Sequence, residues 1–170
     1  MKLLERWATR SLKRMGYDVV RNVDRHPERR PSFPSDAFEA QRKLLEMLGR
    51  SENPMIFDVG ANHGQTATRY RSVFPGADIV CFEPFPESME KLQRTHANDG
   101  KVRAVPLAVG RERGTATFHV NQMSGTNSLF PRPSSSRRYF EAKAAPKTTI
   151  EVDVTTLDAF LREQNLATID

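Results

Sequence analysis

Two apolar segments that each end at a carboxylate, with a glycine-marked turn between them, constrain the fold of this chain more than any other feature. The first segment, residues 55–59, contains Asp58 and is followed by Gly60 and then by Gly64. The second ends at Glu83. This succession of strand, glycine turn, helix, strand and acid is how an open α/β sheet holds the adenosine end of a cofactor. The pattern therefore predicts an α/β fold with a nucleotide-cofactor site at the strand ends.

The residues around the glycines favour S-adenosylmethionine over a dinucleotide. Residues 60–64 do not match Gly-x-Gly-x-x-Gly, in which a helix N-terminus faces a pyrophosphate. S-adenosylmethionine has no phosphate, and an acid beside the glycines, such as Asp58, suits its cationic groups. Glu83 is placed to accept hydrogen bonds from both ribose hydroxyls. An NAD-linked oxidoreductase stays open as an alternative, because Glu83 alone would permit it.

The composition is that of a soluble globular protein. A length of 170 residues predicts one domain with a sizeable core, and 38% hydrophobic and 28% charged residues are ordinary values. No apolar run approaches the ~20 residues of a membrane span, and we expect no secretory signal. The one cysteine, Cys81, fits a reducing compartment, so we expect a cytoplasmic protein. No Cys/His cluster has metal-ligand spacing, so no metal site is predicted.

The basic residues concentrate in a leader, residues 1–34, ahead of a predicted domain over residues 35–170. The leader holds nine Lys and Arg residues against four acids, so it accounts for the whole net charge of +5. A nucleic-acid partner for the neutral remainder is therefore disfavoured. Residues 2–16 predict a basic amphipathic helix, which either packs on the domain itself or contacts a membrane surface or a partner. Residues 22–34 predict a proline-marked linker.

Periodicity and turn residues place the other elements. We expect helices over residues 36–48, 64–74, 86–98 and from about 155 onward, and strands over residues 55–59, 78–83, 102–107, 114–120 and 149–154. Residues 121–147, rich in Ser, Pro and Arg, predict a long mobile loop. Ile169 and Asp170 are expected to begin a further strand. A doubly wound sheet needs more strands than these, so we expect a fold truncated after the third parallel strand.

Three more motifs accompany the two acids: Ala-Val-Gly at 108–110, Ser-Gly-Thr-Asn-Ser-Leu at 124–129 and Val-Thr-Thr-Leu-Asp at 154–158. Together with residues 57–65 and 82–86 they resemble the FkbM-type methyltransferases. The resemblance implies a class I, Rossmann-like three-layer α/β sandwich and S-adenosylmethionine-dependent methyl transfer, commonly to a hydroxyl oxygen of a sugar, glycan or natural product. A non-catalytic cofactor-binding fragment is the alternative, because the predicted sheet is unfinished.

The resemblance also implies which residues contact the cofactor. From the methionine half to the adenine, the expected contacts are Asp58, Gly60, Ala61, Asn62, Gly64, Glu83, Pro84, Phe85 and Ala108. Within this set Glu83 would hold the ribose, and Ala108 would lie beside the base.

A hydroxyl acceptor must also lose a proton, which requires a base. His63, next to the glycine turn, is a weak candidate for this catalytic role, and a solvated loop histidine is the simpler interpretation. His96 is expected at the surface. The expected partner is therefore a small-molecule or glycan acceptor.

Overall fold

The computed structural model describes residues 34–50, 53–131 and 146–169. The predicted helix over residues 2–16 and most of the linker that follows it lie outside these ranges. Along the chain the elements are α2 (Ala37–Met47), β1 (Met55–Val59), α3 (Gln65–Val73), β2 (Asp78–Phe82), α4 (Pro86–Thr95), β3 (Val102–Val105), β4 (Ala108–Val109), β5 (Gly114–Asn121), the 3₁₀ turn η2 (Ser124–Thr126), β6 (Pro146–Thr155) and α5 (Leu157–Glu163).

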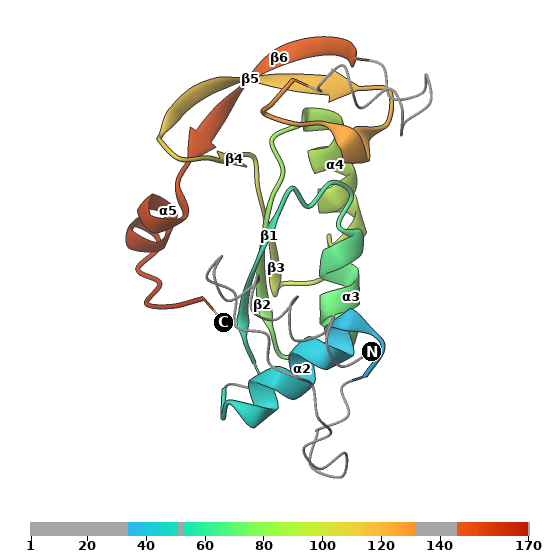
Figure 1. Ribbon diagram of the computed structural model, residues 1–170, viewed down its shortest axis with the longest axis vertical. Helices are drawn as coiled ribbons and strands as arrows, with labels where there is room; N and C mark the ends of the chain where they lie inside the picture. Colours follow the sequence, from blue (N-terminus) through green and yellow to red (C-terminus); the bar gives the residue numbers. More distant parts are fainter. Residues whose placement is uncertain (1–33, 51–52, 132–145, 170) are drawn as a thin grey trace, which may run out of the picture. The chain divides into compact units, whose positions relative to one another are not determined.

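A parallel sheet of β1, β2 and β3, with β2 in the middle, organises the first half of the described region (Figure 1). A central parallel strand is covered on both faces and therefore reads as a continuous apolar run. Strand β2 follows this rule, since every residue after Asp78 is buried. In the register of β1 and β2, Asp58 lies opposite Cys81 and Val59 opposite Phe82. The carboxyl ends of both strands therefore meet at one edge of the sheet.

Helices cover both faces of this sheet and complete three layers (Figure 1). On one face Ile79 packs with residues of α3 and α4, among them Leu92. On the other face Val80 and Phe82 pack against Phe160 of α5. The rings of Phe82 and Phe160 meet edge to face at 4.8 Å between centroids. Successive residues of β2 thus serve opposite helical layers, and the predicted α/β, Rossmann-like architecture is confirmed.

A second sheet, with the strand order β4-β6-β5, follows the parallel one. Strand β6 pairs in parallel with β4 and antiparallel with β5. The predicted strand over residues 102–107 is wrong in its last residues, because β3 ends at Val105 and Ala108 already belongs to the second sheet. Pro106 lies between the two, and proline has no N–H to donate to a strand ladder. The chain therefore changes sheets at this proline.

Three other predicted boundaries differ from the structure. Helix α4 ends at Thr95 rather than near residue 98, because a turn closed by the Asp99 N–H on the His96 carbonyl leads directly into β3. Strand β6 begins at Pro146 rather than at 149, because it pairs along β5 as far as Asn121. Within the predicted 121–147 loop, η2 is ordered helical structure; residues 132–145 lie outside the described ranges.

Residues 166–169 are irregular where Ile169 was expected to begin a strand. Ile169 has no strand pairing, and Asp170 is outside the described residues. A strand forms only where a neighbouring edge offers hydrogen-bond partners. The described residues offer no such partner to Ile169.

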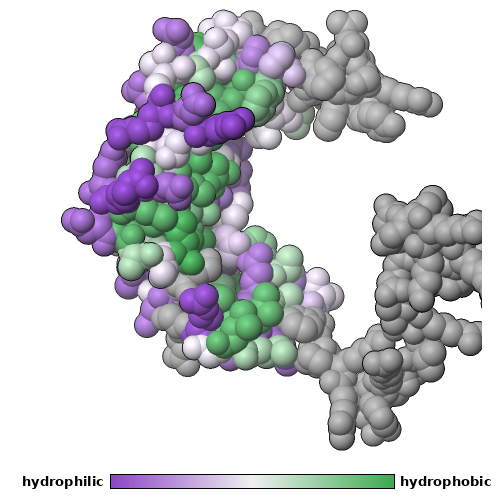
Figure 2. Space-filling model, turned by 60° about the vertical axis from the view of Figure 1, so that its left-hand side comes forward, coloured by the Kyte–Doolittle hydropathy of each residue, from purple (hydrophilic) through white to green (hydrophobic). Residues whose placement is uncertain are grey.

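Apolar side chains are also found at the surface. Leu44 and Met47 of α2 and its C-cap residue Leu48 are exposed, and hydrophobic surface is visible at the lower end of Figure 2, where this helix lies. Val59, at the end of β1, is 51% exposed. Among the described helices none is both long and apolar enough to span a bilayer.

Candidate cofactor site

The turn after β1 folds over the end of β2. Gly60, Asn62 and Gly64 all have left-handed backbone conformations, with φ angles of 80°, 48° and 84°. The first two N–H groups of the turn, from Gly60 and Ala61, donate to the Phe82 carbonyl at 2.9 and 3.0 Å. A left-handed conformation is favourable only for glycine and tolerable for asparagine, so these residue types are what the turn requires.

Glu83 is the carboxylate around which the turn is arranged. Only 5% of this residue is exposed. Its Oε2 accepts a hydrogen bond from the Asn62 N–H at 2.8 Å, and its Oε1 accepts one from the Phe85 N–H at 2.9 Å. Burial raises the pKa of Glu83, and these two donors together with nearby His63 oppose that rise. Two backbone donors therefore hold the carboxylate in one orientation.

Asp58, on the neighbouring strand, is in a different situation. Its Oδ2 is buried and has no hydrogen-bond partner in the described structure. Burial raises the pKa of Asp58, and the negative charge of Glu83 raises it further. The same two effects, burial and then the Asp58 charge, raise the pKa of Cys81 to about 12. The two predicted acids are thus electrostatic neighbours, but only Glu83 is supported by donors.

Side chains of α4 and the residue after it support the turn from behind. Ser88, which is 1% exposed, donates its hydroxyl to Asn62 Oδ1 at 3.0 Å. The His96 ring nitrogen lies 3.2 Å from the Gly64 carbonyl oxygen. His96 was expected at the surface; it is partly exposed, and its ring also contacts the turn, which was not expected. A Cβ on Gly64 would lie 2.7 Å from this ring, so the packing requires glycine there.

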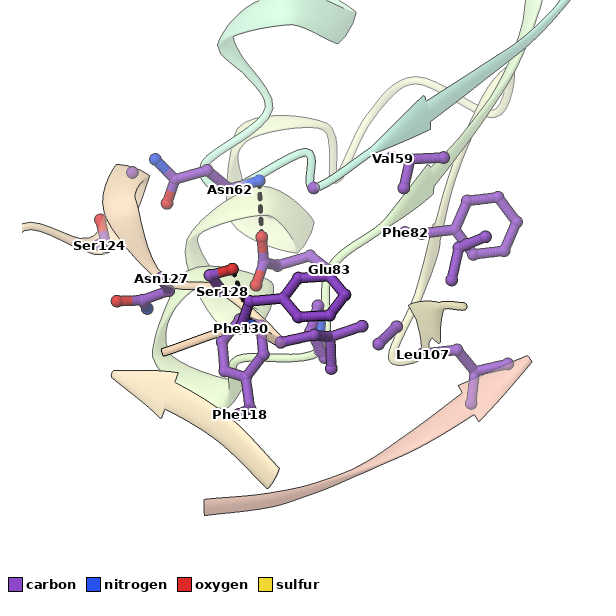
Figure 3. Close-up of a pocket in the computed structure, with 16 residues that line it drawn as sticks. Val59, Asn62, Phe82, Glu83, Leu107, Phe118, Ser124, Asn127, Ser128 and Phe130 are labelled. Carbon is purple, nitrogen blue, oxygen red and sulfur yellow. Dashed lines mark hydrogen bonds between the residues drawn. The ribbon is translucent and has the colours of Figure 1, made fainter. Parts of the chain in front are cut away.

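A pocket of about 250 Å³ opens beside Glu83 at the ends of β1 and β2 (Figure 3). We call the residues that β1, β2 and their following turns contribute the floor, and the residues from the second half of the chain the roof. The floor consists of Val59, Gly60, Asn62, Phe82, Glu83 and Pro84. The roof consists of Leu107, Ala108, Val109, Phe118, Ser124, Gly125, Asn127, Ser128, Leu129 and Phe130.

The pocket has a polar and an apolar side. Figure 3 shows the polar side chains of Asn62, Ser124 and Asn127 on one side of Glu83, and the apolar side chains of Val59 and Leu107 on the other. A ligand with a hydroxylated part and a flat apolar part matches this division.

Hydrogen bonds within the chain hold the roof in place. Ser128 exchanges backbone hydrogen bonds with His119 of β5 at 2.8 and 3.1 Å. The Asn121 N–H donates to Asn127 Oδ1 at 2.8 Å, and the Asn121 side chain donates to the carbonyl of Thr126. These bonds fold the segment after β5 back across the floor.

The structure brings most of the predicted cofactor residues to one place, but not all of them to the pocket. The pocket is lined by Gly60, Asn62, Glu83, Pro84 and Ala108. Asp58, Ala61, Gly64 and Phe85 are not among its lining residues: Ala61 packs in the core, Gly64 and Phe85 cap α3 and α4, and Asp58 lies on β1 with its Oδ2 buried. The weak catalytic candidate His63 does not line it either; its Nε2 lies 3.4 Å from the Ser124 hydroxyl, which does.

Sequence reasoning assigned Ala108 alone among the roof residues to the site. The Ser-Gly-Thr-Asn-Ser-Leu motif at 124–129 was a usable signal, since its asparagine and serines form the hydrogen bonds that fold the roof. Phe118 and Phe130 carried no signal, because their places depend on the β5 register. Within the described residues no cluster of His, Cys, Asp and Glu is arranged to hold a metal ion.

Fold and site together define an α/β protein with a pocket at the carboxyl ends of parallel strands. Comparison with known families makes this specific: the sequence model described as "Methyltransferase FkbM domain" matches residues 58–170. The chain belongs to this methyltransferase family.

Individual relatives are distant. The 2-O-methyltransferase NoeI of Sinorhizobium fredii is 26% identical over 92 residues, which are 54% of this chain and 37% of that protein. The solved structure of methyltransferase FkbM from Methylobacillus flagellatus has 14% identity and a TM-score of 0.39, covering 64% of this chain and 23% of the other. YjhP from E. coli has 15% identity and a TM-score of 0.31, covering 51% and 37%. The chain thus spans little more than a third of the length of the curated relative.

Proposed function

We propose that this chain carries the cofactor site of an S-adenosylmethionine-dependent methyltransferase that acts on a hydroxyl oxygen of a sugar, glycan or natural product. The observation that carries the proposal is the buried, doubly supported carboxylate of Glu83 at the edge of a pocket formed by two parallel strand ends. Family membership supplies the reaction class. The name of the distant relative, a 2-O-methyltransferase, supports a hydroxyl acceptor.

The hydrogen-bonding capacity of Glu83 fits a ribose. An ionised carboxylate has about four lone-pair positions. Two are taken by the N–H groups of Asn62 and Phe85, which leaves one free position on each oxygen. A vicinal diol has two O–H groups to donate, so the 2′- and 3′-hydroxyls of a ribose would fill both. The preformed support of Glu83 means that its orientation needs no rearrangement when the diol binds.

The turn suits the methionine half of the cofactor. Gly60 and Asn62 line the pocket, and the absence of a side chain at Gly60 lets a ligand approach the backbone closely. Asp58 does not line the pocket, so in this proposal it acts through its charge, which together with Glu83 makes the floor favourable to an ammonium and a sulfonium. The buried Oδ2 of Asp58 without a partner is consistent with a site that awaits positive charge.

When bound, S-adenosylmethionine supplies an activated methyl group that passes to the acceptor oxygen by in-line displacement. The part of the protein is to position the acceptor, to keep water out and to take up the hydroxyl proton. His63, next to Ser124 at the pocket, is the described side chain we propose as the candidate base.

Calorimetry with S-adenosylhomocysteine tests the proposal. We expect the wild-type chain to bind it and Glu83→Gln to weaken the affinity by tenfold or more, because a hydrogen bond to a charged group contributes about 1.5–3 kcal/mol. Asp78→Asn is the matched control, since Asp78 is an exposed acid at the opposite end of the same strand. It should leave the affinity within about twofold.

Other outcomes would identify the alternatives. Binding of NAD in place of S-adenosylhomocysteine would indicate an oxidoreductase, and binding of neither would indicate a chain without cofactor function. If Glu83→Gln left the affinity for S-adenosylhomocysteine unchanged, Glu83 would not be the residue that holds the ribose. Methyl transfer from labelled S-adenosylmethionine to a panel of hydroxylated acceptors would then test the reaction itself.

A further inference from the structure

Phe130 is the most exposed large hydrophobic residue in the described part of the chain, at 77%, and it lines the pocket. Exposed phenylalanine rings are unfavourable in water, and one at the rim of a ligand pocket gains free energy when a ligand covers it. Met123, on the same segment, is 55% exposed but does not line the pocket. Met123 is therefore a matched exposed hydrophobic residue outside the pocket.

The backbone at Phe130 is fixed even though its ring is exposed. The Phe130 N–H donates to the Ser128 hydroxyl at 3.0 Å. Ser128 is itself paired with His119 of β5 through two backbone hydrogen bonds. The backbone that carries the ring is thus fixed by the roof. A ring on an ordered backbone loses less entropy when it stacks on a flat ligand than a ring on a mobile segment does.

The pocket that Phe130 shares with Glu83 also has apolar walls. In the view of Figure 3 the Phe130 ring overlaps Glu83, and Leu107, Ala108 and Val109 line the same pocket. A ribose held by Glu83 carries its base directly on the sugar ring. The base of such a ligand therefore needs apolar surface close to Glu83, and Phe130, Ala108 and Val109 offer it in the same pocket.

We propose that Phe130 is a cofactor-specificity residue that stacks on the adenine ring and covers it from solvent. This inference rests on the proposed function, because it takes the ligand of Glu83 to be an adenosyl group. Aromatic side chains bind nucleobases by offset stacking, and the loss of one such stack lowers affinity by about tenfold or more. Ala108 was expected beside the base from sequence; Phe130 supplies the opposite face.

The test compares two ligands that differ only in the base. Calorimetry would measure S-adenosylhomocysteine and S-ribosylhomocysteine, which lacks adenine, against the wild-type chain, Phe130→Ala, Phe130→Trp and Met123→Ala. We expect Phe130→Ala to weaken S-adenosylhomocysteine about tenfold and to leave S-ribosylhomocysteine within twofold. Phe130→Trp should retain the affinity because it keeps a flat aromatic face. Met123→Ala should match the wild type for both ligands.

Three results would overturn the inference. Equal weakening of both ligands by Phe130→Ala would show a general disturbance of the pocket. An unchanged affinity for S-adenosylhomocysteine, with a raised KM for the acceptor, would place Phe130 at the acceptor instead. In both cases the wild-type chain still binds S-adenosylhomocysteine, so the proposed function stands. Failure of the wild-type chain to bind it removes the proposed function and this inference together.

Discussion

The floor and the roof of the pocket differ in how they are built. The floor is made by two neighbouring parallel strands and the tight turns after them, and its central contact joins Glu83 to Asn62 across those strands. The roof combines residues 107–109 and Phe118 of β5 with the irregular segment 124–130, which β5 and asparagine side chains hold in place. Both regions contain apolar residues, but only the floor presents a carboxylate, which two backbone donors hold. The comparison teaches that the floor supplies the charged contact and the roof supplies cover.

The largest expected effect tests whether the roof is a packed unit. Phe118, on β5, is 6% exposed and packs with Ala108, Val120 and Val152. Phe118→Ala should lower the free energy of unfolding by about 3 kcal/mol, because it leaves a cavity in this cluster. Urea denaturation followed by circular dichroism would measure the change. Phe130→Ala is the control, since an exposed ring removed from the same region should change stability by less than about 0.5 kcal/mol.

If Phe118→Ala shifted the urea midpoint no further than Phe130→Ala does, the roof would not be a packed unit. In that case only the floor would be tightly packed, and the roof would be a loosely packed segment above it. The slope of the transition serves as a further check, because a changed slope would indicate a change in the surface exposed on unfolding.

The floor could be predicted from sequence because its signals are local and regular. Three signals predicted β1, the turn and β2 together: an apolar run that ends at Asp58, glycines at two of the three left-handed positions, and an acid after the next run. Each of these signals has one physical cause, and all of them point to the same structure.

The roof could not be predicted in the same way. The change of sheet after Pro106 and the early start of β6 depend on pairing between distant segments, which leaves no period in the local sequence. The turn at 124–129 is closed by side-chain hydrogen bonds, which hydrophobic patterning does not report. For these two reasons the sequence did not identify Phe118 and Phe130 as pocket residues. The sequence also could not predict that Asp58 Oδ2 lacks a hydrogen-bond partner, because this depends on which donors the fold brings close to it.

A smaller effect is expected from glycines on the two sides of the pocket. Gly64 supports the floor with φ at 84°, and a Cβ there would lie 2.7 Å from the His96 ring and 2.8 Å from Leu92. Gly64→Ala should therefore lower the free energy of unfolding by about 2 kcal/mol, through backbone strain and overpacking. Gly125 in the roof has only Asn62 near such a Cβ, at 3.6 Å. Gly125→Ala should stay within about 0.5 kcal/mol.

Thermal melts of the two alanine variants side by side would make this measurement. Equal shifts in Tm would mean that the floor tolerates a side chain at Gly64, and that the His96 ring moves aside without loss. A larger shift for Gly125→Ala would reverse the comparison, because it would show that the roof is the more tightly packed region.

The smallest expected effect is the pH dependence that Asp58, beneath the floor on β1, gives to stability. The pKa of Asp58 is raised by burial and by Glu83, so the folded state holds a proton on Asp58 more firmly than the unfolded state does. Stability from this group is then fully present below the unfolded value, about 3.9, and is lost as pH rises through the folded pKa. The Asp58→Asn variant does not lose this stability as pH rises, because an asparagine side chain does not titrate. The Tm of the variant relative to wild type should therefore rise from pH 4 to pH 7. A Tm difference that stays constant with pH would show that ionising Asp58 in the folded state costs no stability.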